Sequence, residues 1–305
     1  SRYQFLQYAN DDQLAHIPEP YQIMFEKFDA RIVLISEANT KALSNVDPEK
    51  ISKRSQAVGG LINLMLDRAA KGEMRWVGAL FPTQAHAMGA NMSLEEYENF
   101  VYGACLPDMN DPIGYWKKVS AYQNGIVEWF KGRKKIHVIA NETDLWMNIE
   151  GRPFINCDGK ENMPDGEVFT SPVEDSMTGH VYFSYPAIYN GHEVSGVRLW
   201  FENGKVVKAT AEKNNDFLQK TLDTDEGGRY VGEWAIGTNE GIKQFSGEIL
   251  FDEKIGGSFH LAVGTGYPES GGLNRSAIHW DMICDMRPGG EIWVDDILFY
   301  KDGKF

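Results

Sequence analysis

Short apolar, β-branched runs alternate with helix signals along the first part of the chain. The runs ARIVLIS, MRWVGALFP and KKIHVIA predict strands over residues 30–36, 74–82 and 134–140. Helix-start signals lie in the segments that separate these runs. Strands separated by helices are typical of parallel pairing, so we expect an α/β domain over residues 1–140.

The helix starts are marked by capping chemistry. An Asp-Pro pair opens each of the segments 47–71 and 111–131, because Asp can cap the first free amides and proline suits the first helical position. Ser93 followed three residues later by Glu96 forms a capping box, which predicts a helix over 93–105.

Beyond residue 140 the pattern changes to short alternating strands with glycine-containing turns. Residues 197–212 predict a hairpin around an Asn-Gly dipeptide, which tolerates positive φ at both turn positions. A short helix is predicted near 212–222. The last segment, 290–305, is predicted as one strand followed by an Asp-Gly turn at 302–303. We therefore expect residues 141–305 to form an α+β domain dominated by antiparallel sheet.

Composition and charge narrow the classes of partner. The 305 residues are 42% hydrophobic and 24% charged, which is typical of a folded globular protein. The formal net charge of −14 disfavours nucleic acid and anionic membrane surfaces as partners. The acid is concentrated in residues 151–305, with 25 acidic against 14 basic side chains. Solvated surfaces explain most such excesses, but carboxylates around a cation would give the same pattern.

The expected location is cytoplasmic. No run of 18 apolar residues exists, and the first residues lack the basic and apolar regions of a signal peptide. The three cysteines, Cys105, Cys157 and Cys284, fit neither a disulfide framework nor a CxxC metal clip. We expect them to be buried free thiols in a reducing compartment.

The most informative stretch is SAIHWDMICDM, residues 276–286. His279 and Asp281 are two apart in a strand-like run, so both side chains project from one face and Trp280 from the other. This arrangement is half of a metal site. A core histidine hydrogen-bonded to a carboxylate would show the same pattern, and both interpretations stay open on this motif alone.

Three further residues favour the metal interpretation. His260 lies inside an apolar strand, where an unpartnered imidazole would cost a few kcal/mol. Glu167 and Glu233 each follow a glycine and precede an apolar residue, and a charged glutamate in such a strand needs a cation. Two histidines and three carboxylates match the mixed nitrogen and oxygen ligands of a two-metal hydrolase.

Four segments in order make the chain similar to a known family. GEVFTSP, TDEGGRYVGEWAIGTN, LFDE followed by HLAVGTGYPES, and GLNRSAIHWDM resemble the thermophilic-type metalloaminopeptidases, the family of aminopeptidase T and aminopeptidase S. SRYQFLQYANDDQLAHIPEP and the VDPEKISKRSQA helix resemble the first domain of that family. The resemblance implies a two-domain enzyme, with a first domain that lacks the initial strand-helix-strand elements, and a homodimer.

The resemblance also implies the site. Its metal ligands fall on five positions: Glu167, Glu233, His260, His279 and Asp281. Tyr267 matches the tyrosine beside the metals, as a catalytic hydrogen-bond or proton donor; a plain packing role is the alternative. The implied cofactors are two divalent ions, with zinc, cobalt, manganese and magnesium all compatible. The segment 254–258 departs from the family pattern, being shifted and richer in glycine.

The leading hypothesis is a metal-dependent aminopeptidase that hydrolyses N-terminal amino acids from peptides with free N-termini, through water activated by two metal ions. One alternative is a catalytically silent homologue that binds peptide or metal. The other is a metal-dependent amidohydrolase acting on a non-peptide amide. Metal content measured together with turnover of aminoacyl anilides distinguishes them.

Overall fold

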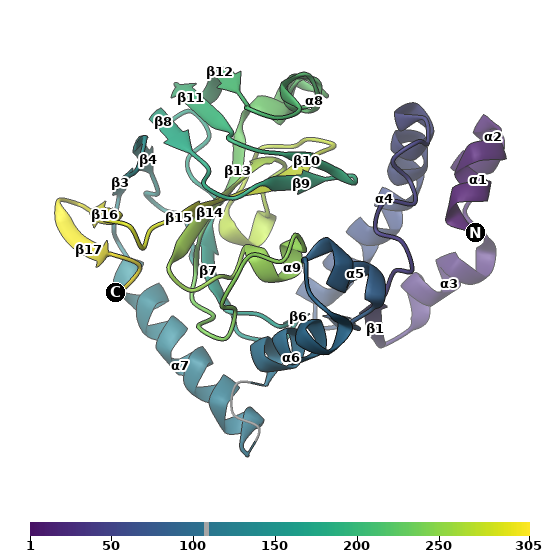
Figure 1. The fold of residues 1–305 in the computed structure, drawn as a ribbon, viewed down its shortest axis with the longest axis horizontal. Coiled ribbons are helices and arrows are strands. Elements are labelled where there is room, and N and C mark those ends of the chain that lie inside the picture. The colour runs from purple at the N-terminus through teal and green to yellow at the C-terminus, as the bar shows by residue number, and fades with distance from the viewer. Residues whose placement is uncertain (107–109) are drawn as a thin grey trace.

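The computed structural model describes residues 1–106 and 110–305 (Figure 1). Within this part, the helices are α1 (Arg2–Tyr8), α2 (Asp11–Ala15), α3 (Glu19–Lys27), α4 (Pro48–Ala70), α5 (Gln84–Gly89), α6 (Leu94–Cys105), α7 (Pro112–Phe130), α8 (Asn215–Leu222) and α9 (Ile249–Asp252), with 3₁₀ turns η1 (Glu226–Arg229) and η2 (Pro268–Ser270). The strands are β1 (Ala30–Ile35), β2 (Arg75–Leu80), β3 (Lys135–Ala140), β4 (Thr143–Asn148), β5 (Ile155–Cys157), β6 (Asn162–Met163), β7 (Glu167–Thr170), β8 (Thr178–Tyr182), β9 (Ala187–Tyr189), β10 (His192–Val194), β11 (Arg198–Glu202), β12 (Lys205–Thr210), β13 (Val231–Gly237), β14 (Ser258–Gly264), β15 (His279–Asp285), β16 (Glu291–Val294) and β17 (Ile297–Lys301).

The N-terminal helices lie on one side of the molecule, beside a small parallel sheet with the order β1-β2-β6 (Figure 1). Parallel pairing of β1 with β2 confirms the prediction for the first two runs. The prediction of parallel pairing is wrong for the third run, since β3 pairs antiparallel with β4 and β16. The reason is local: β3 turns straight back into β4 through Asn141 and Glu142, with Glu142 at φ 47°, so no crossover helix intervenes. The division at residue 140 stays a prediction.

The predicted helix starts are confirmed by their caps. The Asp47 side chain accepts from the amide of Glu49, 3.0 Å away, at the start of α4. Ser93 and Glu96 make both hydrogen bonds of the capping box at α6. Helices α1 and α2 also begin with capping boxes, Ser1 with Gln4 and Asn10 with Gln13, which the sequence analysis did not predict. None of the helices in the described residues is both long and apolar enough to cross a membrane.

Most of the remaining strands form two larger antiparallel sheets that share one core (Figure 1), and β9 and β10 form a separate antiparallel pair. The larger has the order β12-β11-β8-β4-β3-β16-β17, and the smaller has the order β15-β14-β13-β7-β5. Buried side chains from both sheets, among them Leu145 and Trp234, pack into a single cluster. The antiparallel character expected for this part is confirmed, and helix α7 packs against β5 and β7.

Two hairpins test the turn predictions. The turn between β11 and β12 is confirmed, with Asn203 at φ 48° and Gly204 at φ 78°. The C-terminal segment is not one strand, because β16 and β17 form a hairpin through Asp295 and Asp296 at φ 49° and 64°. Aspartate can adopt the left-handed conformation, yet an Asp-Asp pair lacks the glycine that usually marks such a turn.

Candidate metal centre

The candidate site lies on the outer face of the five-stranded sheet. Successive side chains of a strand point to opposite faces, and Trp234, Leu261 and Trp280 point into the core shared with the larger sheet. Glu233 and His260, their neighbours in sequence, therefore project from the other face. They are buried as well, at 4% and 0% exposure. The segment that contains α9 covers this face, since Glu253 contacts His260 there.

Strand register brings the polar residues together. Ala262 on β14 pairs with Glu233 on one side and with Asp281 on the other. Ala235 likewise pairs with His260. Because alanine is small, the longer carboxylate and imidazole side chains on either side can lean over it and converge.

All five residues predicted as ligands meet in this space. One oxygen of Glu233 lies 3.5 Å from Nε2 of His260, and its other oxygen lies 3.4 Å from Nε2 of His279. Glu167 Oε2 is 3.5 Å from Nε2 of His260, and Asp281 Oδ1 is 3.5 Å from Nε2 of His279. The sequence separation of more than a hundred residues is closed by the pairing of four strands.

Backbone carbonyls fix the orientation of both imidazoles. Nδ1–H of His260 donates to the carbonyl oxygen of Glu253 at 2.9 Å, and Nδ1–H of His279 donates to that of Thr265 at 2.9 Å. A carbonyl can only accept, so the proton is on Nδ1 in each ring. Nε2 is thereby aimed at the carboxylates. Histidines that ligate metals are oriented by this kind of second hydrogen bond.

The site is strongly polarised. Burial raises the pKa of Glu233, but the facing imidazoles of His260 and His279 outweigh it and bring the pKa below its ordinary value. Burial raises the pKa of Glu167 to about 8, even though the ammonium of Lys254 opposes the shift. Burial lowers the pKa of His260, but the surrounding carboxylates raise it to about 9. Glu233 therefore stays ionised, whereas the pKa values of Glu167 and His260 are shifted toward retention of a proton.

The residues present fit a divalent ion. Oε2 of Glu167 and Nε2 of His260 are buried and have no hydrogen-bond partner among the described residues, although such atoms normally have one. Four sets of ligand atoms in the described residues lie within 4.8 Å of one another, and two of them consist only of predicted ligands. Glu167, Glu233 and His260 form one, and Glu233, His279 and Asp281 form the other. Carboxylate oxygens and imidazole nitrogens are ligands that zinc, manganese and cobalt accept.

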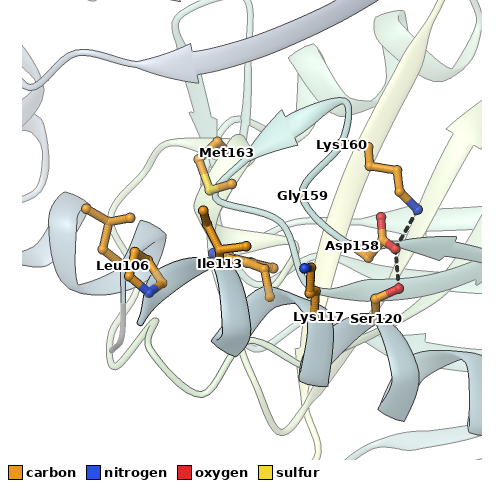
Figure 2. A pocket seen from close by; sticks show the side chains of 10 residues that line it. Leu106, Ile113, Lys117, Ser120, Asp158, Gly159, Lys160 and Met163 are labelled. Atoms are coloured by element: carbon orange, nitrogen blue, oxygen red, sulfur yellow. Dashed lines mark hydrogen bonds and ion pairs between the residues drawn. The ribbon is translucent and has the colours of Figure 1, made fainter. Parts of the chain in front are cut away.

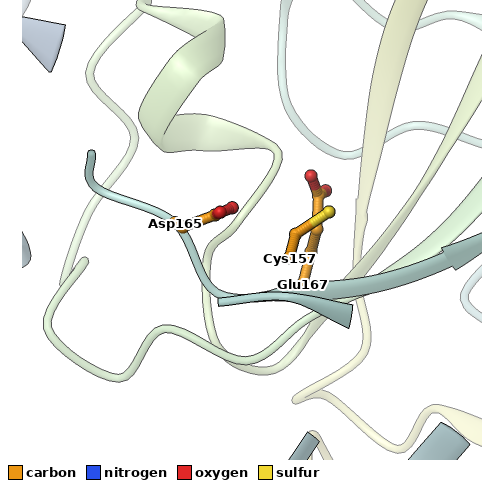
Figure 3. Close-up of side chains that lie close together, drawn as sticks. All are labelled: Cys157, Asp165 and Glu167. Carbon is orange, nitrogen blue, oxygen red and sulfur yellow. The ribbon is translucent and has the colours of Figure 1, made fainter. Parts of the chain in front are cut away.

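Four residues of this neighbourhood were missed by sequence analysis. Glu253 lies within the same ligand distance of His260 and Asp281. Lys254 is fully buried beside it. Cys157 and Asp165 lie close to Glu167, with Asp165 pointing toward the other two (Figure 3). The available signal was the LFDE motif followed by a lysine, a charged pair placed between buried apolar residues.

Tyr267 lies beside the centre, half-buried. Its ring meets that of His279 edge to face with centroids 5.1 Å apart, and that of Phe169 at 5.5 Å. Burial raises the pKa of Tyr267, so the phenol keeps its proton at neutral pH. A protonated phenol can donate a hydrogen bond to a charge that develops near His279.

A separate cavity of about 460 Å³ contains none of the five predicted ligands. It lies along α7, between apolar side chains such as Ile113 and Met163 and a polar end where Asp158 accepts from Ser120 and pairs with Lys160 (Figure 2).

A family comparison agrees with this geometry. The model of the family described as thermophilic metalloprotease (M29) matches residues 1–305. The chain belongs to this family. The resemblance drawn from the four sequence segments is thereby confirmed, and membership places the chain among metal-dependent hydrolases.

Individual relatives are consistent with membership of this family. The chain is similar to Aminopeptidase AmpS of Bacillus subtilis (28% identity, 91% of this chain and 75% of the relative) and to Aminopeptidase T of Thermus thermophilus (27% identity, 92% and 74%). Its fold matches the structure of wild-type AmpT from Thermus thermophilus with a TM-score of 0.85 at 24% identity, over 100% of this chain and 84% of the other. A more distant match is 2,5-dihydroxypyridine dioxygenase from Pseudomonas putida KT2440 (TM-score 0.52, 17% identity, 97% of each chain). The site, not the fold, must therefore identify the reaction.

Proposed function

We propose that this M29 protein is an aminopeptidase that uses two divalent ions held by Glu167, Glu233, His260, His279 and Asp281. One observation carries the number of ions. The two oxygens of Glu233 face different imidazoles, at 3.5 and 3.4 Å, so this carboxylate belongs to both sets of ligand atoms. Glu233 would thus supply a ligand oxygen at each of two neighbouring positions.

Each of the site residues would then have a separate role in the reaction. Bound divalent ions supply an acidified water and polarise the scissile carbonyl. Glu233 keeps the two positions adjacent, while the Nδ1–H bonds of His260 and His279 keep both Nε2 atoms turned inward. Tyr267 holds its proton on the phenol oxygen and donates a hydrogen bond to the oxyanion that forms beside His279.

The donor set of the site supports a substrate with a free N-terminus. Two bound divalent ions would offset the charges of Glu167, Glu233, Glu253 and Asp281, so a free α-amino group would be recognised by an ion or by one of these carboxylates and not by a net negative charge. The relatives' names point to the same substrate class. Assembly as a homodimer and a cytoplasmic location stay predictions, as does the choice among zinc, cobalt, manganese and magnesium.

The test combines metal removal with a pair of substrates. We expect hydrolysis of leucine p-nitroanilide to stop after treatment with a chelator and to return with added divalent ion. N-acetylated leucine p-nitroanilide should react about 5- to 150-fold more slowly, because the lost ammonium leaves a buried polar partner unmet at about 1 to 3 kcal/mol. Metal bound stoichiometrically without turnover would select a binding protein. Equal rates on both anilides would select another amidohydrolase.

A further inference from the structure

Lys254 places a fixed positive charge inside the acidic cluster. Its side chain has 0% exposure, which is rare for lysine. It directly follows Glu253, and its ammonium contacts the Glu253 carboxylate. Nζ also lies 3.6 Å from Oε1 of Glu167. Among the described residues, these two carboxylates are its ion-pair partners, and both lie against His260.

The ammonium is held as a charge. It lies between the carboxylates of Glu253 and Glu167, and a buried ammonium group is accommodated when it is paired with carboxylates in this way. Cys157, Asp165 and Glu167 could themselves hold a metal ion by their spacing, and Asp165 keeps one buried oxygen without a partner. The lysine charge already neutralises this side of the cluster, where an extra ion would otherwise be needed.

Glu167 is divided between the lysine and the metal centre. Its Oε1 faces Lys254 at 3.6 Å, while its Oε2 faces Nε2 of His260 at 3.5 Å. Glu233, His279 and Asp281, which form the second set of ligand atoms, make no ion pair with Lys254 in the described part of the chain. The fixed charge therefore contacts a ligand of the first position directly and reaches the second only through Glu253, whose carboxylate lies within 4.8 Å of a ligand atom of Asp281.

We propose that Lys254 is a positioning residue that makes the two ion positions unequal. It holds the carboxylates of Glu167 and Glu253 and repels the cation at the Glu167/His260 position, which then binds its ion weakly and exchangeably. The Glu233/His279/Asp281 position binds its ion tightly. This inference rests on the two positions of the proposed function. It assigns Lys254 no contact with the substrate.

The unequal positions have a consequence for metal loading. With one weak position, the protein passes through a state with a single ion as free metal falls. The lysine charge keeps Glu167 and Glu253 from being left as unpaired buried carboxylates in that state, which would be strongly destabilising.

The experiment is a titration of metal-free protein with zinc alone, with bound metal counted by mass spectrometry and affinities measured against a competing chelator. We expect two steps in the wild-type protein, separated by about tenfold or more. In Lys254→Met the weaker step should tighten by at least about tenfold, because a unit charge a few ångströms from the ion is removed. Lys254→Arg should keep the steps apart. Lys220→Met, at an exposed position on α8, is the matched control and should leave both steps unchanged.

Two indistinguishable zinc steps in the wild-type protein would overturn the inference, and this result does not depend on any variant folding. Unchanged affinities in folded Lys254→Met would overturn it as well. Chelator-sensitive turnover together with equal steps would leave the aminopeptidase intact and remove only the role of Lys254. Absence of zinc binding and of turnover would instead remove the proposed function.

Discussion

Strand β1 of the parallel sheet and strand β14 of the antiparallel sheet are both apolar runs, but they differ in how deeply they are buried. Along β1, exposed and half-buried residues alternate, and Ile32 and Leu34 are 74% and 66% exposed. Along β14 every residue is buried, His260 included. Burial on both faces turns a polar residue into evidence of function, because such a residue is costly unless it is partnered.

The two regions also differ in how they are stabilised. Around the N-terminal helices the buried side chains form two small clusters, one around Leu14 and one around Phe25. Helix caps and local turns contribute much of the order there. The antiparallel region packs both sheets into one large cluster around residues such as Trp234. A precise site requires well-packed support, and the candidate metal centre lies on this sheet.

The sharpest test of the comparison is Glu233→Gln in the antiparallel region. The change keeps the shape of the side chain but removes the charge that faces both imidazoles. We expect turnover to fall by at least about 10³-fold and bound metal to drop below two ions per chain. Glu202→Gln, an exposed glutamate on β11, serves as the control. Full activity in Glu233→Gln would exclude Glu233 as a shared ligand.

The sequence alone predicted local features well. The helix caps at Asp47 and Ser93 and the Asn-Gly turn needed only neighbouring residues, and all were found. The predicted parallel pairing of β3 was wrong. Its antiparallel pairing with β4 is decided by a turn at 141–142, and this turn contains no glycine that would mark it in the sequence. Local sequence patterns do not tell which strands pair with one another.

The sequence also marked some residues of the candidate site and not others. His260, His279 and Asp281 stood out as polar residues in apolar strands, a signal that the sequence carries by itself. Lys254 did not, since a lysine beside glycines is usually exposed. Its burial depends on α9 folding over the sheet and on Glu167 arriving from β7, and both are long-range events.

The second test probes the support beneath the site. Trp234 is fully buried on the inner face of β13, next in sequence to Glu233. Trp234→Ala should lower the free energy of unfolding by about 3 to 5 kcal/mol, through lost burial and a cavity. Denaturant unfolding of metal-free protein measures this. A loss below about 1 kcal/mol would show that the shared core does not stabilise the site strand.

The third test separates chemistry from metal binding within the site. Tyr267→Phe keeps the ring contacts with His279 and Phe169 and removes only the hydroxyl. We expect kcat to fall by about 10²- to 10³-fold with KM and metal content close to wild type, because a donor to the oxyanion acts mainly in the transition state. Unchanged kcat at full metal occupancy would reduce Tyr267 to a packing residue.

The smallest effect is expected at the exposed face of β1. Ile32→Thr and Leu34→Thr exchange apolar side chains for a β-branched polar one that suits a strand, at positions where most of the side chain is already in water. Substitutions on such surfaces usually change the free energy of unfolding by no more than about 0.5 kcal/mol. Val263→Thr on β14 is the matched comparison, fully buried in the shared core, where the unpaired hydroxyl should cost about 1 to 3 kcal/mol. Equilibrium denaturation at two protein concentrations measures all three. A loss above about 2 kcal/mol at Ile32 that shrinks as the protein is diluted would mean that a second copy covers β1 in solution, because dilution removes the stabilisation that the wild-type protein gains from association. The contrast between the two regions would then belong to the single chain only.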